Sequence, residues 1–438
     1  DVTAYLSMMA IRLIELHRVL KLTGSIYLHC DPTASSYLRI LMDAVFGASN
    51  LRSFIVWKRF SSHGNVYKTF GQVQDNILFY AKKSDESTWN QLYKPLSENY
   101  IASFFKYVEP GTNRRYRLQN VLNPNKDRPN LTYEWHGHVR VWKWTKDRMQ
   151  RLEDAGLLEY SKTGLLKGFK QYLDDNPGEK LQDIWDDIRP VGQSDDVNLG
   201  YPTQKPRALL ERIVAASSNE NDIVLDPFCG CGTAVHAAQA LNRRWIGNDI
   251  THLAIGLIRR RMTDAFPGID INVIGEPVDI GGARELAARD KYQFQWWALD
   301  RIGAQPVAGK KKGADKGIDG VIPYVDAAPS EFKRVIVSVK GGEQAGVGAV
   351  RDLIGVMKRE DEPIGVLVTL NKATKDMLVE ATTAGHYENE LWKKSYPRVQ
   401  ILTVEDILAG KRPKMPPQHS PFAKAQVERE RAEEPRLL

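Results

Sequence analysis

The sequence predicts an α/β protein in which two α/β units flank an irregular basic region. Three observations support this class. Apolar segments with helical spacing alternate with short apolar strand-like segments over 1–83 and 199–275. The alternation stops between 84 and 198, and it returns from 286 to 410. The chain has 438 residues, of which 42% are hydrophobic and 26% charged, so it can fill more than one core.

The first 83 residues predict two helices and three strands. Leucine and methionine recur at steps of three and four along the opening segment, which is the spacing of one helix face, and Gly24 follows it. Gly47 stops the second helical pattern in the same way. The expected helices span 4–21 and 35–46, and the expected strands span 25–30, 54–59 and 76–81.

Residues 84–198 are basic and aromatic with poor periodicity. Between 101 and 150 there are ten Lys or Arg against four Asp or Glu, a balance of +6, together with eight aromatic residues. Cations bind phosphate and rings stack on bases, so this mixture favours nucleic-acid binding. The alternative is an ordinary small β-rich module with a charged surface. The prominent cations are Arg114, Arg115, Arg117, Lys143 and Lys146.

Regular α/β order is predicted again from 206 to about 265. The expected strands are 222–226 and 244–249, and the expected helices are 206–218, 233–241 and one that ends near 265. Residues 275–285 are expected to form a linker. Beyond it we expect a helix to 303, strands at 334–340, 364–370 and 398–403, and helices at 347–359 and 372–384. Residues 411–438 are rich in Pro, Lys, Arg and Glu and predict a disordered or frayed tail.

Composition excludes several classes of protein. The strongly apolar runs are far shorter than the roughly 20 residues that a membrane helix needs. The opening segment carries charges throughout, unlike a signal peptide. Three cysteines cannot build a disulfide framework. We therefore expect a soluble protein of a reducing compartment, with no membrane partner. The net charge of +7 and pI of about 9.0 are mild for this length.

The segment 222-DIVLDPFCGCGTAVHAAQALNRRWIGNDI-250 carries the sharpest signal. Gly230 and Gly232 follow an apolar strand and let the backbone approach a ligand closely. The next helix offers free N–H groups and a positive dipole end to an anion. Asp249 ends the following strand, where an acidic residue accepts hydrogen bonds from ribose hydroxyls. The two nearby cysteines do not complete a tetrahedral metal site.

This strand, turn, helix and terminal Asp resemble the cofactor motifs of S-adenosylmethionine-dependent DNA amino-methyltransferases. The preceding 202-PTQKP-206 resembles the element that comes before these motifs in the β-order subgroup. The resemblance implies that Phe228 lies beside the cofactor, that the two glycines approach its methionine part, and that Asp249 holds its ribose. Cofactor-binding residues implied by it are Thr203, Gln204, Lys205, Asp226, Phe228, Gly230, Gly232 and Asp249.

The order of segments agrees with that subgroup. Residues 15–83 resemble the stretch that follows the catalytic motif, so 1–83 is expected to be the catalytic half. Residues 84–198 then fall where a target-recognition region belongs, and 199–275 form the cofactor-binding half. The resemblance implies a Rossmann-like sheet with an inserted recognition region. It also implies double-stranded DNA as substrate and methyl transfer to the amino group of adenine (N6) or cytosine (N4).

The catalytic motif of these enzymes, Asp/Asn/Ser-Pro-Pro-Tyr/Phe, does not occur in the 438 residues. The closest match is 31-DPTA-34, which lacks the second proline and the aromatic ring, and whose Asp31 also suits a helix N-cap. The chain opens with Asp1 rather than Met, directly in a helical pattern. We therefore expect a fragment whose catalytic motif lies upstream.

The C-terminal unit resembles an Mrr-like restriction endonuclease domain over about 286–405. The resemblance rests on 315-DKGIDGVI-322 followed by 334-RVIVSVKGG-342, in which Asp319 and Lys340 fit an acid and a lysine of a nuclease site. It implies that Asp319 binds Mg²⁺, with Glu285 or Glu343 as candidates to complete the site. Ser338 stands where an acid or Gln is expected. The alternative is a non-catalytic α/β domain.

The sequence therefore predicts a site-specific DNA methyltransferase fused to an endonuclease-like domain. Such a fusion suggests restriction-modification in the bacterial cytoplasm, and a homodimer is included in the expectation. A second interpretation is a nuclease or DNA-binding module that uses the methyltransferase half for recognition. A small-molecule or RNA methyltransferase is a third, and the PTQKP element and the inserted basic region oppose it.

Overall fold

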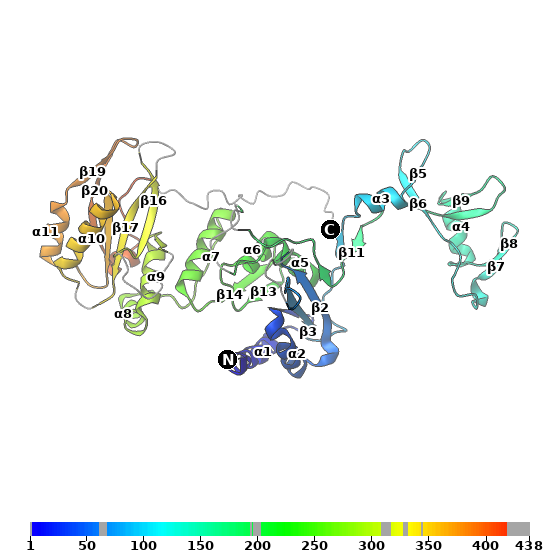
Figure 1. Cartoon of the computed structure of the whole chain (residues 1–438), viewed down its shortest axis with the longest axis horizontal. Coiled ribbons are helices and arrows are strands. Elements are labelled where there is room, and N and C mark those ends of the chain that lie inside the picture. The colour runs from blue at the N-terminus through cyan, green and yellow to red at the C-terminus, as the bar shows by residue number, and fades with distance from the viewer. Residues whose placement is uncertain are drawn as a thin grey trace. The chain divides into compact units, whose positions relative to one another are not determined.

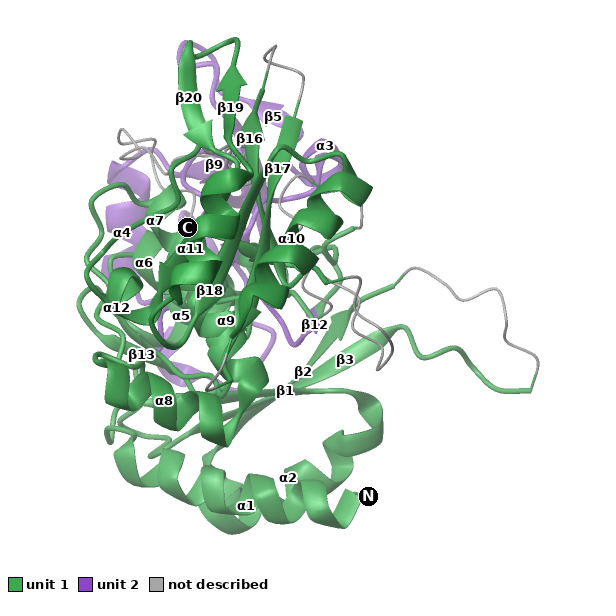
Figure 2. Ribbon diagram, turned by 90° about the vertical axis from the view of Figure 1, so that its left-hand side faces the viewer, with its two compact units in different colours: residues 1–88, 185–431 green, residues 89–184, 432–438 purple. Residues whose placement is uncertain are grey.

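A computed structural model of the chain describes most of its residues and divides them into two compact units (Figure 1). The described residues of unit 1 fall within 2–88 and 185–417, and those of unit 2 fall within 89–184 (Figure 2). Within the described ranges, no helix has the length and apolarity required to cross a membrane. The described residues are 2–60, 68–192, 195, 203–307, 317–326, 332–342 and 345–417.

An antiparallel sheet forms the N-terminal part of unit 1. Its strand order is β1–β3–β2–β12, and β3 runs antiparallel to both β1 and β2. The central strand β3 is almost entirely buried, as its apolar sequence NILFYA requires. These strands confirm the three strands expected in this region. Their bounds are β1 (Ser25–Cys30), β2 (Leu51–Lys58), β3 (Gln74–Ala81) and β12 (Ile184–Trp185).

Helices cover both faces of this sheet. On one face, α1 (Val2–Val19) and α2 (Pro32–Phe46) bury a core with Leu13 and Leu38 against Leu78. On the other face, α5 (Arg207–Ser217) contributes Leu209 to a second core around Trp57 and Phe79. A short 3₁₀ turn, η1 (Ala48–Asn50), leads into β2.

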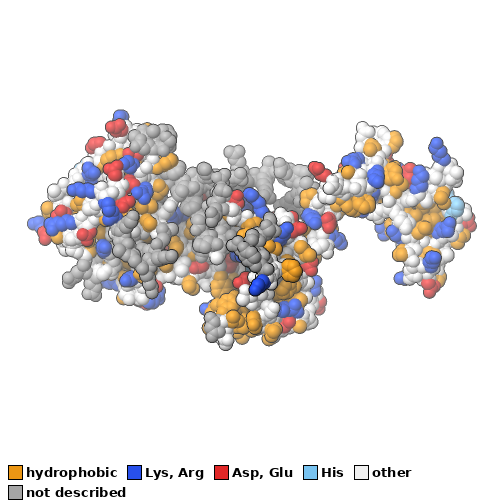
Figure 3. All heavy atoms as spheres, in the orientation of Figure 1, with side chains coloured by type: hydrophobic (Ala, Val, Ile, Leu, Met, Phe, Trp, Pro, Cys, Tyr) orange, Lys and Arg blue, Asp and Glu red, His pale blue; other side chains and the backbone are white. Residues whose placement is uncertain are grey.

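The hydrophobic side chains of α1 and α2 are not all buried. Ile11, Ile14, Tyr37 and Ile40 are exposed. Figure 3 shows hydrophobic side chains gathered over this N-terminal part of the molecule.

The strands around the glycine turn form a second, separate sheet. β13 (Ile223–Asp226) and β14 (Arg244–Gly247) pair in parallel, with Leu225 opposite Ile246. Helices α6 (Thr233–Ala240) and α7 (His252–Ala265) pack on one face through Val235 and Ile258. The strands expected for one Rossmann-like sheet thus lie in two sheets. Among the described residues, β1 and β13 each have one edge without a strand partner.

The face of this small sheet that lies away from α6 carries apolar side chains. Ile223 is 45% exposed, Leu225 is 40% exposed and Ile246 is 55% exposed. A parallel sheet in an α/β protein is normally covered on both faces and reads as continuous apolar sequence. The described residues therefore leave one edge and one face of β13 uncovered.

The C-terminal part of unit 1 is a five-stranded mixed sheet with order β15–β16–β17–β18–β21. β17, β18 and β21 run parallel, and β15 and β16 are antiparallel additions. The strand β18, which lies between β17 and β21, is wholly buried, which explains its apolar sequence IGVLVT. The bounds are β15 (Gln305–Pro306), β16 (Gly320–Val325), β17 (Phe332–Lys340), β18 (Ile364–Thr369) and β21 (Val399–Thr403).

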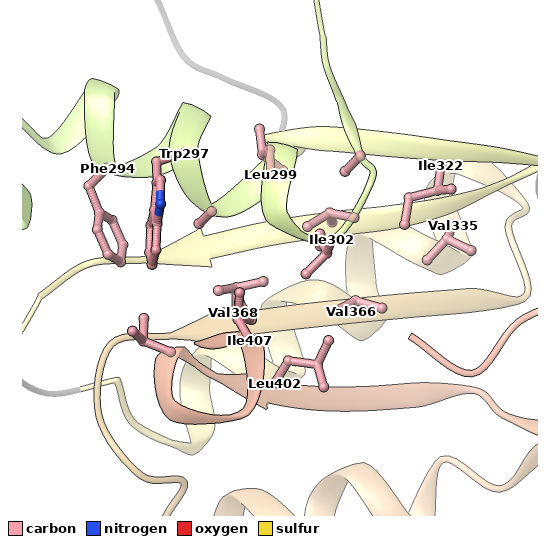
Figure 4. Close-up of a cluster of buried hydrophobic side chains, with 14 of the residues drawn as sticks. Phe294, Trp297, Leu299, Ile302, Ile322, Val335, Val366, Val368, Leu402 and Ile407 are labelled. Atoms are coloured by element: carbon pink, nitrogen blue, oxygen red, sulfur yellow. The ribbon is translucent and has the colours of Figure 1, made fainter. Parts of the chain in front are cut away.

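Helices again cover both faces of this sheet. One core joins Phe294 and Trp297 to Val335, Val366 and Val368 (Figure 4). A second core on the opposite face joins α10 and α11 to the sheet. The helices are α8 (Ile280–Arg289), α9 (Lys291–Arg301), α10 (Val347–Glu360), α11 (Lys375–Thr383) and α12 (Val404–Leu408), and a hairpin of β19 (His386–Asn389) and β20 (Lys394–Pro397) adjoins them.

The expected linker and tail are both more ordered than the sequence indicated. Helix α8 begins at Ile280, because Asp279 caps it through the Gly282 amide and its apolar residues enter the core. Lys414 exchanges two hydrogen bonds with Gln400 of β21. Residues 411–417 are thus docked, and the rest of the predicted tail lies outside the described residues.

A buried ion network joins α7 to the C-terminal part. Arg259 on α7 bonds both Glu276 and Asp300, and Arg301 bonds Glu276 at 3.1 Å. The side chains of Glu276 and Asp300 are only 7% and 8% exposed. Burial raises the pKa of Asp300, and the neighbouring arginines oppose that rise. Each carboxylate is therefore compensated only while its arginine partners stay in place.

Unit 2 is a small mixed unit with short strands. Its main sheet has the order β5–β6–β10–β9, and a hairpin β7–β8 packs with it around Trp135, Trp142 and Met149. The elements are β4 (Tyr93–Lys94), α3 (Glu98–Phe104), β5 (Tyr107–Val108), β6 (Arg115–Gln119), η2 (Pro129–Leu131), β7 (Thr132–Trp135), β8 (His138–Val141), α4 (Lys146–Asp154), β9 (Leu158–Tyr160), β10 (Leu166–Tyr172) and β11 (Glu179–Lys180).

Candidate functional site

Two glycines with positive φ shape the turn between β13 and α6. Gly230 has φ 48° and Gly232 has φ 74°. A Cβ on Gly232 would lie 2.7 Å from Cγ1 of Ile258, so both backbone conformation and packing require glycine there. Helix α6 then begins at Thr233 without a side-chain cap. Its first backbone N–H groups are available for an anionic or polar ligand.

Asp249 ties this turn to the neighbouring strand. Its Oδ2 accepts a hydrogen bond from the Gly230 amide at 3.0 Å. Its Oδ1 accepts from the amide and the hydroxyl of Thr251, at 3.0 and 2.9 Å. Because β13 and β14 are parallel, their carboxyl ends meet at one edge of the sheet. The structure thus brings together the glycine turn and the acidic residue that the sequence placed in one site.

Asp226 and Phe228 lie in the same turn. Asp226 Oδ1 accepts a hydrogen bond from the Phe228 amide at 3.1 Å, which fixes the residue after Pro227. Burial raises the pKa of Asp226, and the nearby charge of Asp249 raises it further. Phe228 is 51% exposed, so its ring is accessible to a ligand. Asp226 therefore serves the shape of the turn, and Phe228 offers an apolar contact.

Lys205 lies in a cationic and acidic cluster that sequence reasoning missed. Asp75, at the start of β3, accepts a hydrogen bond from His29 Nε2 at 2.8 Å and lies 3.3 Å from the guanidinium of Arg59. Burial would raise the pKa of Asp75, but the His29 bond and the charges of His29, Arg59 and Lys205 lower it. Burial lowers the pKa of Lys205, and Asp75 opposes that effect. Thr203 is exposed, two residues before Lys205.

No spacing pattern could have revealed this cluster. His29 lies on β1, Asp75 lies on β3, and Arg59 directly follows β2, so pairing of these strands brings the three residues together, while Lys205 comes from a loop. The one feature of the sequence that pointed to this cluster was the acidic Asp75 directly before the apolar strand sequence 76-NILFYA-81. That signal alone does not distinguish a functional acid from a strand-end residue.

The two cysteines of the turn are core residues. Cys229 and Cys231 are buried, and burial raises the pKa of Cys229 to about 12. Among the described residues, no group of three or more His, Cys, Asp or Glu side chains could hold a metal ion. The thiols therefore fill space beneath the turn, where Cys229 Sγ lies 3.2 Å from a Cβ built on Gly247.

Because His236 on α6 is buried, we expect the local stability of α6 to depend on pH. Burial lowers its pKa to about 3, whereas an unfolded histidine titrates near about 6.5. As the pH falls, the His236 side chain therefore becomes protonated in the unfolded segment before it does in the folded helix. Proton binding then favours the unfolded segment, so the stability of α6 is lost progressively below about pH 6.5. Between about pH 7 and pH 5 we expect the opening free energy of α6 to fall by up to about 2 kcal/mol. Amide hydrogen exchange of residues 233–240 measures it. A His236→Gln variant should show a smaller pH dependence, and an equal dependence would contradict the assignment.

Asp31 is a helix cap. It precedes α2, and its Oδ1 accepts a hydrogen bond from the Ala34 amide at 3.0 Å. Pro32 occupies the first turn, as is usual after such a cap. The structure confirms the N-cap alternative for this residue.

The five cations predicted to bind DNA differ in their surroundings within unit 2. Arg114 bonds Asp174 and Asp175 and lies over the Tyr172 ring. Arg115 donates to the Phe105 carbonyl, and Arg117 donates to Gln171. These three arginines hold the fold of unit 2. Lys143 and Lys146 are exposed, and the described part of unit 2 gives their side chains no hydrogen-bond or ion-pair partner.

Other exposed cations adjoin these two lysines. Arg140 is exposed on β8, and Arg148 on α4 lies over the Trp144 ring at 5.7 Å. Half of the eight aromatic residues of the 101–150 window are core instead: Phe105, Tyr116, Trp135 and Trp142 are buried. Residues 140–148, called here the cationic segment, therefore carry four exposed cations within nine residues, and Lys106, Lys126 and Arg128 are exposed elsewhere in the window.

In the described residues of the C-terminal part, the nuclease-like Asp319 is hydrogen-bonded within the fold. Asp319 Oδ2 accepts the Val339 amide at 2.7 Å, and its Oδ1 accepts from Gln295 at 2.9 Å. Ser338 also donates to Asp319, at 3.4 Å. The carboxylate is thus engaged by the surrounding fold. Glu285 is exposed on α8, and Glu343 lies outside the described residues.

Ser338 and Lys340 line a cavity of about 410 Å³. It lies between the end of β17 and α10, and Arg351 and Arg359 of α10 line it as well. Asp319 is not among its lining residues. Lys340 thus lines the cavity, and Asp319 hydrogen-bonds Ser338 of the same lining and the amide of Val339, so their joint role in a nuclease site stays a prediction.

The chain is similar to two families. Residues 1–259 match a family described as DNA methylase, and residues 291–409 match one described as NACHT-associated inactive restriction endonuclease 1. Over 262 residues the chain is 31% identical to the type II methyltransferase M.EcaI of Enterobacter cloacae, covering 59% of this chain and 57% of that protein. Over 254 residues it is 28% identical to the Mod subunit of the type III restriction-modification enzyme StyLTI of Salmonella typhimurium, covering 55% and 38%.

The chain thus spans roughly half of the length of these relatives, or less. Among solved structures, it is similar to the PvuII DNA methyltransferase (cytosine-N4-specific), with a TM-score of 0.36 and 11% identity over 62% of this chain and 73% of the other.

Proposed function

Because the chain belongs to the DNA methylase family, we propose that it transfers a methyl group from S-adenosylmethionine to an exocyclic amino group of adenine (N6) or cytosine (N4) in duplex DNA. The glycine turn with Asp249 carries this proposal. It combines backbone N–H groups at a helix start, an acid at the adjoining strand end and an exposed aromatic ring. The bound cofactor supplies a methyl group activated on a sulfonium.

The residues of the turn fit this cofactor. Asp249 would accept hydrogen bonds from the ribose hydroxyls, and its bonds to Gly230 and Thr251 already fix its orientation. Phe228 would pack beside the cofactor. Gly230 and Gly232 would pass close to its methionine part. Thr203 and Lys205 would lie near its carboxylate, and the burial of Lys205 would strengthen the attraction.

Asp249→Asn is expected to weaken S-adenosylmethionine binding by about ten- to a hundredfold, because hydrogen bonds to a charged group contribute about 1.5–3 kcal/mol. Isothermal titration calorimetry on the full chain measures the affinity. Asp270→Asn is the matched control, since Asp270 is exposed in the same half of the domain. Circular dichroism melting checks that the turn still folds. Equal affinity of Asp249→Asn and the unaltered chain would refute the site.

We also propose that the catalytic motif belongs to a segment preceding Asp1. The open edges of β1 and β13 support it, because a strand with that motif could pair with both. The exposed Ile223, Leu225 and Ile246 support it as well, since an added layer would bury them. Lys21 lies 4.0 Å from Asp222, so the chain just before β1 and the chain just before β13 are neighbours.

Unit 2 is proposed to recognise the target sequence. Its exposed cationic segment supports this role, because phosphate contacts position a protein on duplex DNA. The similarity to type II and type III modification proteins supports a part in bacterial restriction-modification, in the cytoplasm where DNA is accessible. A homodimer stays a prediction.

A second candidate function concerns the C-terminal part, as a restriction nuclease or as a DNA-binding module. A nuclease would require Mg²⁺ held by Asp319, with Lys340 at the water or the scissile phosphate. The bonded carboxylate of Asp319 favours the binding module, as does the similarity to a family described as inactive. Cleavage of plasmid DNA by the full chain with Mg²⁺ tests the nuclease, and Lys340→Ala should abolish any such cleavage.

A further inference from the structure

The cavity beside α10 has the composition of an anion site. Its lining includes three cations, Lys340, Arg351 and Arg359, and one acid, Asp352, which leaves a balance of +2. Among the described residues, the lining includes no second carboxylate that could share a divalent cation with Asp352. Positive charge on the wall of a concave site attracts phosphate oxygens directly.

The cations are accessible although two of them have partners. Arg351 bonds Glu380 at 3.0 Å, and Arg359 bonds Glu360 at 3.1 Å. Both arginine side chains are about half exposed or more, so water screens these pairs and a phosphate can compete for them. Lys340 is exposed, and within the described ranges no hydrogen bond or ion pair involves its side chain.

The spacing along α10 indicates an extended ligand. Arg351 and Arg359 are eight residues apart, which is about 12 Å along a helix. Guanidinium groups spread along a helix in this way suit several phosphates of a nucleic-acid strand better than a single phosphate ion. Gly355 lies between them, and a Cβ built on it meets no atom within 4 Å. The helix surface between the two arginines is therefore open to close approach.

We propose that this cavity binds the phosphate backbone of duplex DNA without a metal ion. The choice of DNA rests on the proposed function, and the metal independence rests on the geometry at Asp319. A Mg²⁺-dependent site would need the Asp319 carboxylate, which instead accepts hydrogen bonds from Val339 and Gln295. The nuclease-like part then adds a second contact to DNA, apart from the cationic segment of unit 2.

Chemical protection of Lys340 tests the cavity in the full chain. Lysines are acetylated with and without a DNA duplex in the presence of EDTA, and each site is quantified by mass spectrometry. DNA is expected to slow the acetylation of Lys340 at least about threefold, while Lys393 on the distant hairpin connection reacts equally in both samples. An Arg351→Ala/Arg359→Ala variant should lose this protection, and the slope of log affinity against log salt should shrink by up to about two.

A matched variant and two ligands separate the alternatives. Lys291→Ala/Lys394→Ala removes the same charge from exposed positions and should keep the protection of Lys340. Inorganic phosphate at millimolar concentration should not protect Lys340; protection by phosphate alone would identify a small-anion pocket and overturn the assignment to DNA. Protection that appears only with Mg²⁺ would overturn the metal-free site. If DNA binds and Lys340 stays reactive, the assignment of a DNA site to the cavity is wrong, and the proposed function still stands. If the chain binds no DNA, the proposed function is wrong as well.

Discussion

If the proposed segment with the catalytic motif is added before Asp1, methyl transfer to duplex DNA is expected to rise by at least about a thousandfold over residues 1–438. The proposed cofactor turn lies within residues 1–438, whereas the Asp/Asn/Ser-Pro-Pro-Tyr/Phe motif, whose polar residue would accept hydrogen bonds from the target amino group, does not occur in this sequence. Positioning and polarising that nitrogen accounts for rate factors of this size. Transfer of tritiated methyl groups from S-adenosylmethionine to duplex DNA measures the rate.

Two controls make this test specific. In the lengthened chain, replacing the motif's first polar residue by Ala should return the rate to that of residues 1–438. Asp31→Ala should lower stability by about 1 kcal/mol through the lost cap, without a selective loss of methyl transfer. Methylation by residues 1–438 at the rate of the lengthened chain would show that the acceptor is already present. The same extension should also protect the β1 and β13 amides from hydrogen exchange.

Neutralising the cationic segment is expected to reduce duplex binding by about a hundredfold or more at roughly 0.1 M salt. The variant replaces Arg140, Lys143, Lys146 and Arg148 by Ala. Each phosphate contact that is lost removes one counterion-release event, so the slope of log affinity against log salt should shrink by up to about four. Fluorescence anisotropy with a labelled duplex over a salt series measures both quantities.

The comparison variant carries the same change in net charge elsewhere. Lys291, Lys393, Lys394 and Lys414 are exposed in the C-terminal part, and their replacement by Ala should leave the slope nearly unchanged. Equal losses in the two variants would mean that net charge rather than this segment governs binding. Arg114, Arg115 and Arg117 are excluded from the variant, because their removal would break contacts that hold unit 2 together.

The regular elements of unit 1 could be predicted because their patterns are local. The strand 25–30 is confirmed at both ends, and the helix expected at 347–359 is observed as Val347–Glu360. The start of α11 was expected at 372 and lies at Lys375, because the Thr374 side chain caps the helix through the Met377 amide. The glycine turn could be predicted for the same reason: its residues are contiguous and their chemistry is specific.

Contacts between distant segments could not be predicted. Composition placed Arg117 and Lys143 in one group of expected DNA-binding cations. Pairing of β6 with β10 puts Arg117 beside Gln171, which accepts its hydrogen bond. Lys143 and Lys146 are exposed instead. The same limit applies to the surroundings of Asp319. Gln295 of α9 and the Val339 amide of β17 donate hydrogen bonds to its carboxylate, and the motif spacing gave no sign of the bond from Gln295.

The ion network between α7 and α9 restricts how a gene for this chain could be rearranged. A recombination event within codons 277–290 would part Arg259 and Glu276 from Asp300 and Arg301. A new partner domain that lacked matching charges would leave buried carboxylates or guanidinium groups uncompensated, at a cost of about 3–5 kcal/mol for each broken pair. We therefore expect the two halves of unit 1 to be inherited together, and exchange of unit 2, which returns to unit 1 at Trp185, to be the easier route to a new DNA target.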